Sequence, residues 1–230
     1  MTSVQQKDDL RRLMEQVETI ATSPENQRKA EHWKRYWSGV PANKDPDGPL
    51  FSLDIGIPTW ARILHFDVRQ YYSDTYTQIR CQLLMRLYHH ANIADDTVVG
   101  VGIGVNPVGV VLEPSMLGVE IGFPPDMEPW ALHNRAVVES ESDLAGLAMP
   151  DFYTSGAMPS VHRMYGQARE LMQALDGDRW SVGFPAAIRG VLGLAQAMRG
   201  PHENILMDML ERPAFAHRMF GHVTDFHCAY

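Results

Sequence analysis

Cysteine is scarce in this sequence, since its 230 residues include only Cys81 and Cys228. Two thiols so far apart fit the reduced cysteines of a cytosolic protein better than a disulfide framework. Long apolar runs are missing as well. The longest, residues 98–112, is interrupted by glycines, an asparagine and a proline, and it is too short to span a bilayer. The first 13 residues lack the apolar core of a signal peptide, so we expect a cytoplasmic protein with no membrane partner.

Basic residues are in deficit, with 20 Lys and Arg against 28 Asp and Glu and a net charge of −8. A protein with this charge and no basic stripe repels phosphate backbones, so nucleic acid is not an expected partner. Low-complexity blocks are absent too. The composition, 45% hydrophobic and 21% charged, is that of an ordinary globular protein.

Helical patterns open the chain. Apolar residues recur at helical spacing over residues 4–21, and Ser23 followed by Pro24 predicts the start of a second helix that runs to Trp37. Its aromatic residues cluster on one side and are expected to dock it onto the main body. The next segment, 40–49, has three prolines, Gly48 and two aspartates, which is typical of a linker. We therefore predict a helical extension and linker over residues 1–49 and a main domain over residues 50–230.

The main domain alternates between strand and helix patterns. Strands are expected at 59–66, 97–103, 108–112, 118–123, 136–138 and 180–184, and helices at 73–90, 158–175, 191–198, 203–210 and from 213 to the end. Helices of ten or more residues between strands predict parallel pairing and an α/β fold. The last helix has a buried-type apolar stripe and stops at Tyr230 with no cap or polar tail. We expect the architecture to continue beyond it.

Three segments carry a family resemblance. They are the strand, turn and helices of 180–226, beginning WSVGFPAAIRG; the loop MPDFYTSGAMPS of 149–160; and LGVEIGF of 117–123. In this order and spacing they resemble the uroporphyrinogen decarboxylase superfamily. The resemblance implies a TIM-type (β/α)₈ barrel with its active site at the carboxyl ends of the strands. Because such a barrel needs about 250 residues, we expect only its first half here, completed by a partner chain or by oligomerisation if 230 residues is the native length.

The resemblance also implies an activity. The family's namesake removes carboxyl groups from the side chains of a tetrapyrrole without a cofactor, using arginines for the carboxylates and a buried aspartate for the pyrrole N–H groups. Arg69 and Gln70 match the start of the family's arginine motif, but its second arginine is Ser73 here. The aspartate position falls on Gly109 and the family's tyrosine near Gln196. The leading hypothesis is a decarboxylase-like enzyme of tetrapyrrole metabolism that binds a small-molecule substrate.

Two alternatives remain open. A second branch of the superfamily transfers methyl groups between corrinoid proteins and thiols with a zinc ion. LEPSMLG, residues 112–118, resembles its glutamate motif with Glu113 in the glutamate position; the zinc ligands of that branch lie in the missing half. The third hypothesis is a catalytically empty partial barrel that acts as a binding or assembly subunit. Arg189 follows the last expected strand directly and joins Arg69, Gln70 and Glu113 as a candidate substrate-binding residue.

The histidines do not predict a metal site. His217, His222 and His227 are five residues apart, and each step turns about 140° around a helix, so they cannot face one ion. His89 and His90 at a helix end are expected to complement the helix dipole. The glycine run of 100–104 is not followed by a helix, which argues against a dinucleotide site. No general acid or base can be assigned from the sequence.

Overall fold

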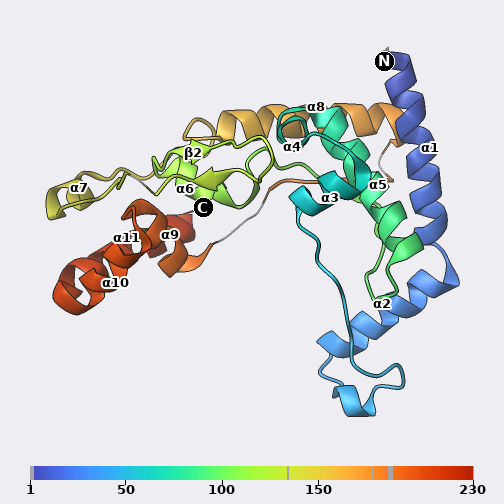
Figure 1. Ribbon diagram of the computed structural model, residues 1–230, viewed down its shortest axis with the longest axis horizontal. Helices are drawn as coiled ribbons and strands as arrows, with labels where there is room; N and C mark the ends of the chain where they lie inside the picture. Colours follow the sequence, from blue (N-terminus) through green and yellow to red (C-terminus); the bar gives the residue numbers. More distant parts are fainter. Residues whose placement is uncertain (1–2, 134, 178, 186–188, 230) are drawn as a thin grey trace. The chain divides into compact units, whose positions relative to one another are not determined.

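The computed structural model describes residues 3–133, 135–177, 179–185 and 189–229. It divides into two compact units (Figure 1). Unit 1 comprises Met1–Val105 and Gly166–Gly183, and unit 2 comprises Asn106–Tyr165 and Phe184–Tyr230. Residues on both sides of the boundary expected at residue 49 belong to unit 1. Within the described residues, no helix is long and apolar enough to cross a membrane.

Helices form most of unit 1. Ser23 caps α2 as predicted, because its hydroxyl accepts the backbone N–H of Asn26 at 3.1 Å, and Asp74 caps α5 through Thr77. The strand expected at 59–66 is wrong. Its apolar residues also fit helical spacing, and with Pro58 in the first turn the segment folds as helix α3. The helices of unit 1 before its strands are α1 (Ser3–Ala21), α2 (Pro24–Trp37), η1 (Ala42–Lys44), α3 (Ile57–Leu64), α4 (Val68–Ser73) and α5 (Thr75–Asn92).

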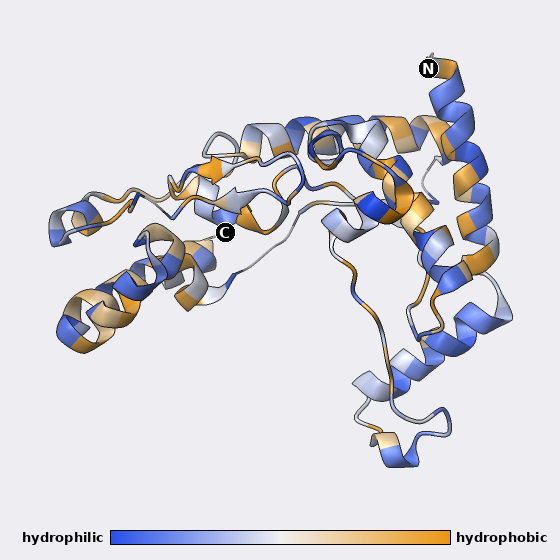
Figure 2. Cartoon of the chain, viewed as in Figure 1, coloured by the Kyte–Doolittle hydropathy of each residue, from blue (hydrophilic) through white to orange (hydrophobic). Residues whose placement is uncertain are grey.

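The main contact of unit 1 lies between α1 and α5. The buried face of α1 is formed by Leu10, Leu13, Met14 and Val17. Figure 2 shows hydrophobic and hydrophilic residues interspersed along this helix. From α5, Ile79 and Leu83 are fully buried. This pattern is that of an amphipathic helix held by its apolar stripe.

Strands are few and short. β1 (Gly102–Gly104) pairs in parallel with β4 (Ser181–Gly183), and the long connection between them includes α8 (Met158–Asp176). β2 (Ile121–Gly122) pairs with β3 (Trp130–Ala131) in antiparallel orientation. One parallel pair is therefore present, but the described residues are mostly helical, which does not support the expected barrel. The described residues form these two pairs and no closed sheet.

Other expected strands take a different form in unit 2. Residues 108–112 fold as η2 (Gly109–Val111) and the start of α6 (Leu112–Met116), with Gly109 at a positive φ of 56° that ends any extended run. Residues 136–138 form no strand; instead, the N–H groups of Val137 and Val138 both donate to the carbonyl of Met198. Both segments contribute buried side chains to the core of the unit, namely Val108, Val111, Leu112 and Val138.

The remaining helices of unit 2 are α7 (Glu141–Gly146), α9 (Gly190–Met198), α10 (His202–Glu211) and α11 (Pro213–Ala229). The apolar stripe predicted for the last helix is confirmed: Phe215, Met219, Val223 and Phe226 of α11 are buried. They pack in one cluster with residues of α6, α8 and α9.

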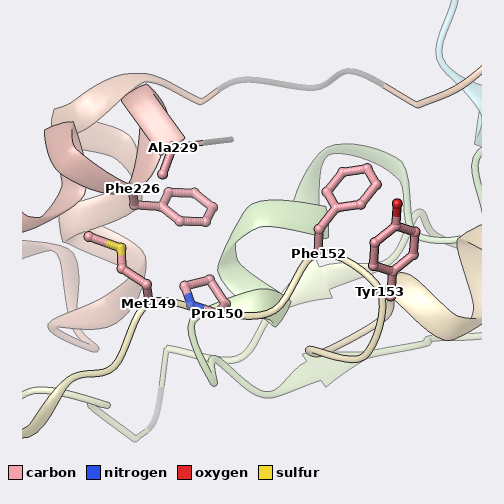
Figure 3. A pocket seen from close by; sticks show the side chains of 6 residues that line it. All are labelled: Met149, Pro150, Phe152, Tyr153, Phe226 and Ala229. Carbon is pink, nitrogen blue, oxygen red and sulfur yellow. The ribbon is translucent and has the colours of Figure 1, made fainter.

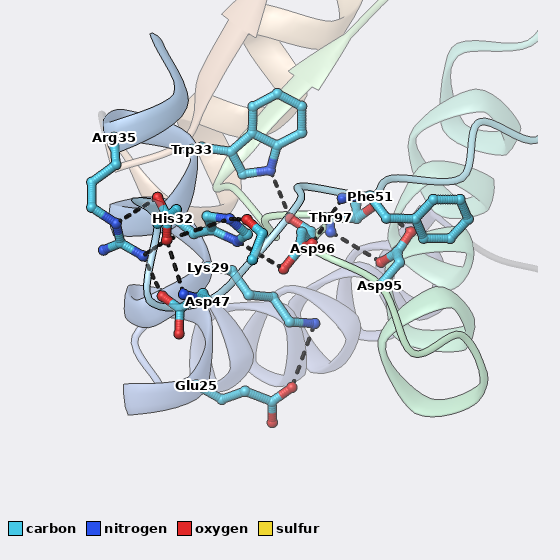
Figure 4. Close-up of polar contacts among 12 residues, drawn as sticks. Glu25, Lys29, His32, Trp33, Arg35, Asp47, Phe51, Asp95, Asp96 and Thr97 are labelled. Atoms are coloured by element: carbon cyan, nitrogen blue, oxygen red, sulfur yellow. Dashed lines mark hydrogen bonds and ion pairs between the residues drawn. The ribbon is translucent and has the colours of Figure 1, made fainter. Parts of the chain in front are cut away.

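The segment predicted as a linker is bound tightly to the rest of unit 1 (Figure 4). Arg35 pairs with Asp45 and Asp47. His32 contacts Asp96 at 3.2 Å and the carbonyl of Gly48 at 3.2 Å. Burial opposes the charged form of His32, but these two hydrogen bonds and the carboxylates of Asp96 and Asp45 raise its pKa. The segment 40–49 thus has the composition of a linker but forms an ordered loop.

Asp95, next to Asp96 in the chain, has its own set of hydrogen bonds. Its side chain accepts hydrogen bonds from the N–H groups of Leu53 and Thr97, from the Thr97 hydroxyl and from His89, at 2.8–3.0 Å. Burial would raise the pKa of Asp95, but these hydrogen bonds outweigh it and lower the pKa to about 2. His89 therefore does more than complement the dipole of α5, because it donates to a buried carboxylate.

The substitution Asp95→Asn is expected to lower the free energy of unfolding by about 2 kcal/mol at neutral pH. The pKa of Asp95 is lower in the folded chain than its ordinary 3.8, so its contribution is complete above pH 4 and is lost as the pH falls toward 2. Urea unfolding from pH 7 to pH 2.5 should show the difference between the two proteins shrinking with acid. Asp54→Asn, at an exposed carboxylate, is the matched control. A difference that stays constant with pH contradicts the assignment.

Candidate functional site

Segments after the two parallel strands meet in unit 2. Glu113, on α6, follows β1 in the chain, and Arg189 follows β4. The Glu113 side chain is 1% exposed, and its Oε2 accepts the backbone N–H of Arg189 at 2.7 Å. Two of the candidate residues are therefore in direct contact.

The loop of 149–160 joins the same place. The Ser115 hydroxyl donates to the carbonyl of Leu112 at 2.6 Å and accepts the N–H of Ala157 at 3.1 Å. Gly156 has a φ of 53°, and a Cβ at this position would lie 2.3 Å from the backbone carbonyl of Ser115. A side chain cannot fit between backbones this close, so the loop requires a glycine at this position.

The second oxygen of Glu113 faces a histidine. Glu113 Oε1 lies 3.0 Å from Nε2 of His227 on α11, but the two atoms are not aligned as a hydrogen bond, and both are buried without another partner. A buried carboxylate oxygen without an aligned donor is costly. This oxygen can pair with a charged imidazole or accept an N–H or O–H group from a ligand.

A cavity of about 380 Å³ lies in unit 2 (Figure 3). Its lining is Met149, Pro150, Phe152, Tyr153, Phe226 and Ala229. Phe152 and Tyr153 face Met149 and Phe226 across it, and Phe226 lies next to His227, with ring centroids 5.6 Å apart. Phe152 is itself stacked on Phe184 at 5.8 Å. Aromatic walls of this kind suit a flat, largely apolar ring.

The other candidate residues lie in unit 1. Arg69 and Gln70 are exposed on α4. The backbone N–H of Gln70 donates to the Asp67 side chain, which caps the helix.

Gly109, at the family's aspartate position, needs its positive φ for the turn before α6. A glycine is favoured there for a conformational reason, and the buried carboxylate nearest in sequence is Glu113.

His133 and His202 of unit 2 lie side by side, with ring centroids 4.3 Å apart. Burial, followed by the charges of His202 and Arg189, lowers the pKa of His133. Among the described residues, no group of three or more His, Cys, Asp or Glu side chains is arranged to hold a metal ion.

Sequence reasoning found Glu113 and Arg189 but missed His227 as the partner of Glu113. Nothing in the spacing of the α11 histidines links one of them to a residue of α6. The aromatic walls of the cavity were also missed, because Phe152 and Phe226 come from a loop and a helix far apart in the chain.

Comparison with protein-family models, with curated proteins and with solved structures finds no match for this chain.

Proposed function

We propose that this chain is a uroporphyrinogen decarboxylase-type protein that contributes the first half of a (β/α)₈ barrel and binds a tetrapyrrole or a related cyclic ligand. One observation carries the proposal. Segments from each of the three stretches that resemble the superfamily, or directly adjoining them, come together around Glu113: its own α6, the Gly156 loop and the Arg189 turn. A cytoplasmic location and completion by a partner chain or a second copy belong to the same proposal.

The ligand chemistry follows from the residues around the site. The aromatic walls at Phe152, Tyr153 and Phe226 offer an apolar face for a ring. Glu113 Oε1 offers an acceptor for pyrrole N–H groups and a fixed negative charge for a ring that becomes positive during decarboxylation. This assigns to Glu113 the role that the family gives to an aspartate at the position of Gly109. His227 lies beside the same oxygen, so its side chain has to turn away when a ligand binds there.

Arg189 is the residue of this site that can hold a ligand carboxylate. Its backbone is fixed by Glu113, while its side chain is partly exposed in the turn before α9. A guanidinium binds a carboxylate with two parallel hydrogen bonds, which a lysine cannot do. The hydrogen bond between Glu113 and the backbone of Arg189 therefore holds this arginine next to the Glu113 carboxylate, which is proposed to bind the ring.

The variant Glu113→Gln is expected to weaken binding of coproporphyrin, a stable tetrapyrrole probe, by about tenfold or more. An amide keeps the shape of the side chain but loses the charge-assisted hydrogen bond, which contributes about 1.5–3 kcal/mol. Titration of the full chain, followed by the absorbance of the porphyrin, measures the affinity. Glu120→Gln, at an exposed carboxylate of the same segment, should bind as the unmodified chain does. Equal affinity of all three proteins sinks the role proposed for Glu113.

Corrinoid-linked methyl transfer is the second candidate. The buried glutamate at position 113 favours it, because that branch of the superfamily has a glutamate at this position. Cobalamin in place of coproporphyrin distinguishes the two: a thermal midpoint that rises with cobalamin alone supports methyl transfer and, with it, a zinc ion supplied by the missing half. A folded chain that responds to neither ligand supports the third candidate, an empty barrel that serves in assembly.

A further inference from the structure

Aromatic side chains of α2 form an exposed surface on unit 1. The sequence pattern predicts that Trp33, Tyr36 and Trp37 dock the helix onto the body, and for two of them this is wrong. Tyr36 is 52% exposed and Trp37 is 76% exposed, whereas Trp33 is partly buried. Large aromatic residues left in water are uncommon away from binding surfaces.

A shallow cleft of about 450 Å³ adjoins these rings. The rings of Trp33 and Trp37 are within 23° of parallel, with centroids 6.3 Å apart. Trp33 is held in place because its Nε1–H donates to the carbonyl of Asp96 at 2.7 Å (Figure 4). The lining contains no charged side chain; it consists of Ala30, Trp33, Trp37, Ser52, Thr97 and Val98. The cleft thus combines a preformed aromatic platform with two hydroxyl groups.

The direction of the hydrogen bonds at these hydroxyls can be worked out. Asp95 is ionised at neutral pH and can only accept, so the Thr97 hydroxyl donates its proton to Asp95 at 2.8 Å. In the 2.8 Å contact between Ser52 and Thr97, the donor must then be Ser52. The Ser52 oxygen keeps its lone pairs, so the polar rim of the cleft accepts a hydrogen bond from a ligand.

We propose that this cleft binds a neutral pyranose sugar. The apolar C–H face of the sugar ring stacks on the exposed ring of Trp37, which is itself stacked on Trp33, and one of its hydroxyl groups donates to Ser52. The uncharged lining and the net charge of −8 disfavour phosphorylated ligands. Trp37 is highly exposed, so the cleft covers only one face of a bound ring. A site for a purine usually encloses both faces of the ring, and this cleft does not. The site lies in unit 1, and its occupancy does not depend on Glu113.

Ligand-observed NMR on the full chain tests the proposal, with glucose, galactose and mannose as probes and adenosine as the competing flat ligand. We expect saturation transfer from the protein to at least one sugar, a weaker signal for adenosine, and a loss of about tenfold in sugar affinity in Trp37→Ala. Ser52→Ala should bind the sugar more weakly, while Trp130→Ala, at an exposed tryptophan of unit 2, should not change it.

Several results overturn the proposal. No transfer to any sugar, preference for adenosine, or unchanged sugar binding in Trp37→Ala each exclude a sugar site. If no sugar binds and Trp37→Ala instead abolishes self-association in analytical ultracentrifugation, the surface docks a second copy of the chain. Sugar binding that persists in Glu113→Gln is expected, so this test and the porphyrin titration can fail separately.

Discussion

Replacing Gly156 with alanine is expected to lower the free energy of unfolding by about 3 kcal/mol or more. Two effects add. The φ of 53° is strained for any residue with a Cβ, and that Cβ would lie 2.3 Å from the backbone carbonyl of Ser115. The obstructing atoms are backbone atoms and cannot turn aside as a side chain can. Relief requires the loop to move away from α6, which breaks the hydrogen bond between Ala157 and Ser115.

Gly221→Ala is the matched control for this substitution. Gly221 lies within α11 of the same unit, and a Cβ there meets nothing within 4 Å. Alanine at this position should stabilise the chain by about 0.5–1 kcal/mol, because glycine is a poor helix former. Chemical unfolding followed by circular dichroism measures both variants. If Gly156→Ala stays within about 0.5 kcal/mol of the unmodified chain, the close approach of the loop to α6 is wrong.

Replacing Asp208 with alanine is expected to cost about 3–5 kcal/mol, the range found when one member of a buried ion pair is removed. Asp208 of α10 is buried, and so is Arg199, whose Nε donates to it at 2.6 Å. Arg212 donates to the other carboxylate oxygen at 2.7 and 2.9 Å. Without Asp208, the buried guanidinium of Arg199 keeps its hydrogen bond to the carbonyl of Val138 and its contact with the Phe215 ring but loses its ion pair.

Glu211→Ala provides the comparison for Asp208→Ala, since Glu211 lies on the same helix with an exposed side chain. Its effect should stay within about 0.5 kcal/mol. Urea unfolding of both variants at neutral pH gives the two values. Similar, small losses for the two substitutions show that the Arg199–Asp208 pair is exposed to water in solution and contradict the packing of α10.

Helices with strong end signals could be predicted from the sequence, and strands only in part. β2 and β4 lie within the expected segments 118–123 and 180–184, and β1 overlaps 97–103. The Ser23–Pro24 start of α2 and the apolar stripe of α11 depend on neighbouring residues, so local pattern is enough to find them. The segment 59–66 fits both a strand and a helix, and the proline at its start favours the helix. Residues 108–112 read as a strand because they are apolar, but Val108, Val111 and Leu112 are buried as parts of helical turns packed in the core of unit 2.

The candidate site could be predicted only in part, because several of its contacts join segments far apart in the chain. Glu113 was chosen by a motif and Arg189 by its position after an expected strand, and the structure joins the two by a hydrogen bond. The contact of Glu113 with His227 joins α6 to α11, and no local pattern encodes it. Asp95 shows the same limit, because its four donors come from three separate segments of the chain. Arg69 and Gln70, chosen by motif alone, are exposed residues of α4 in unit 1.

Hydrogen exchange of the full chain with and without coproporphyrin tests the central claim most directly, since it locates a bound ring on the sequence. The account predicts slower exchange in residues 149–153 and in the last turns of α11, which line the aromatic cavity, and in α6 around Glu113. Exchange in α2 should not change. Protection confined to other segments, or no protection at saturating porphyrin, contradicts a tetrapyrrole site at Glu113.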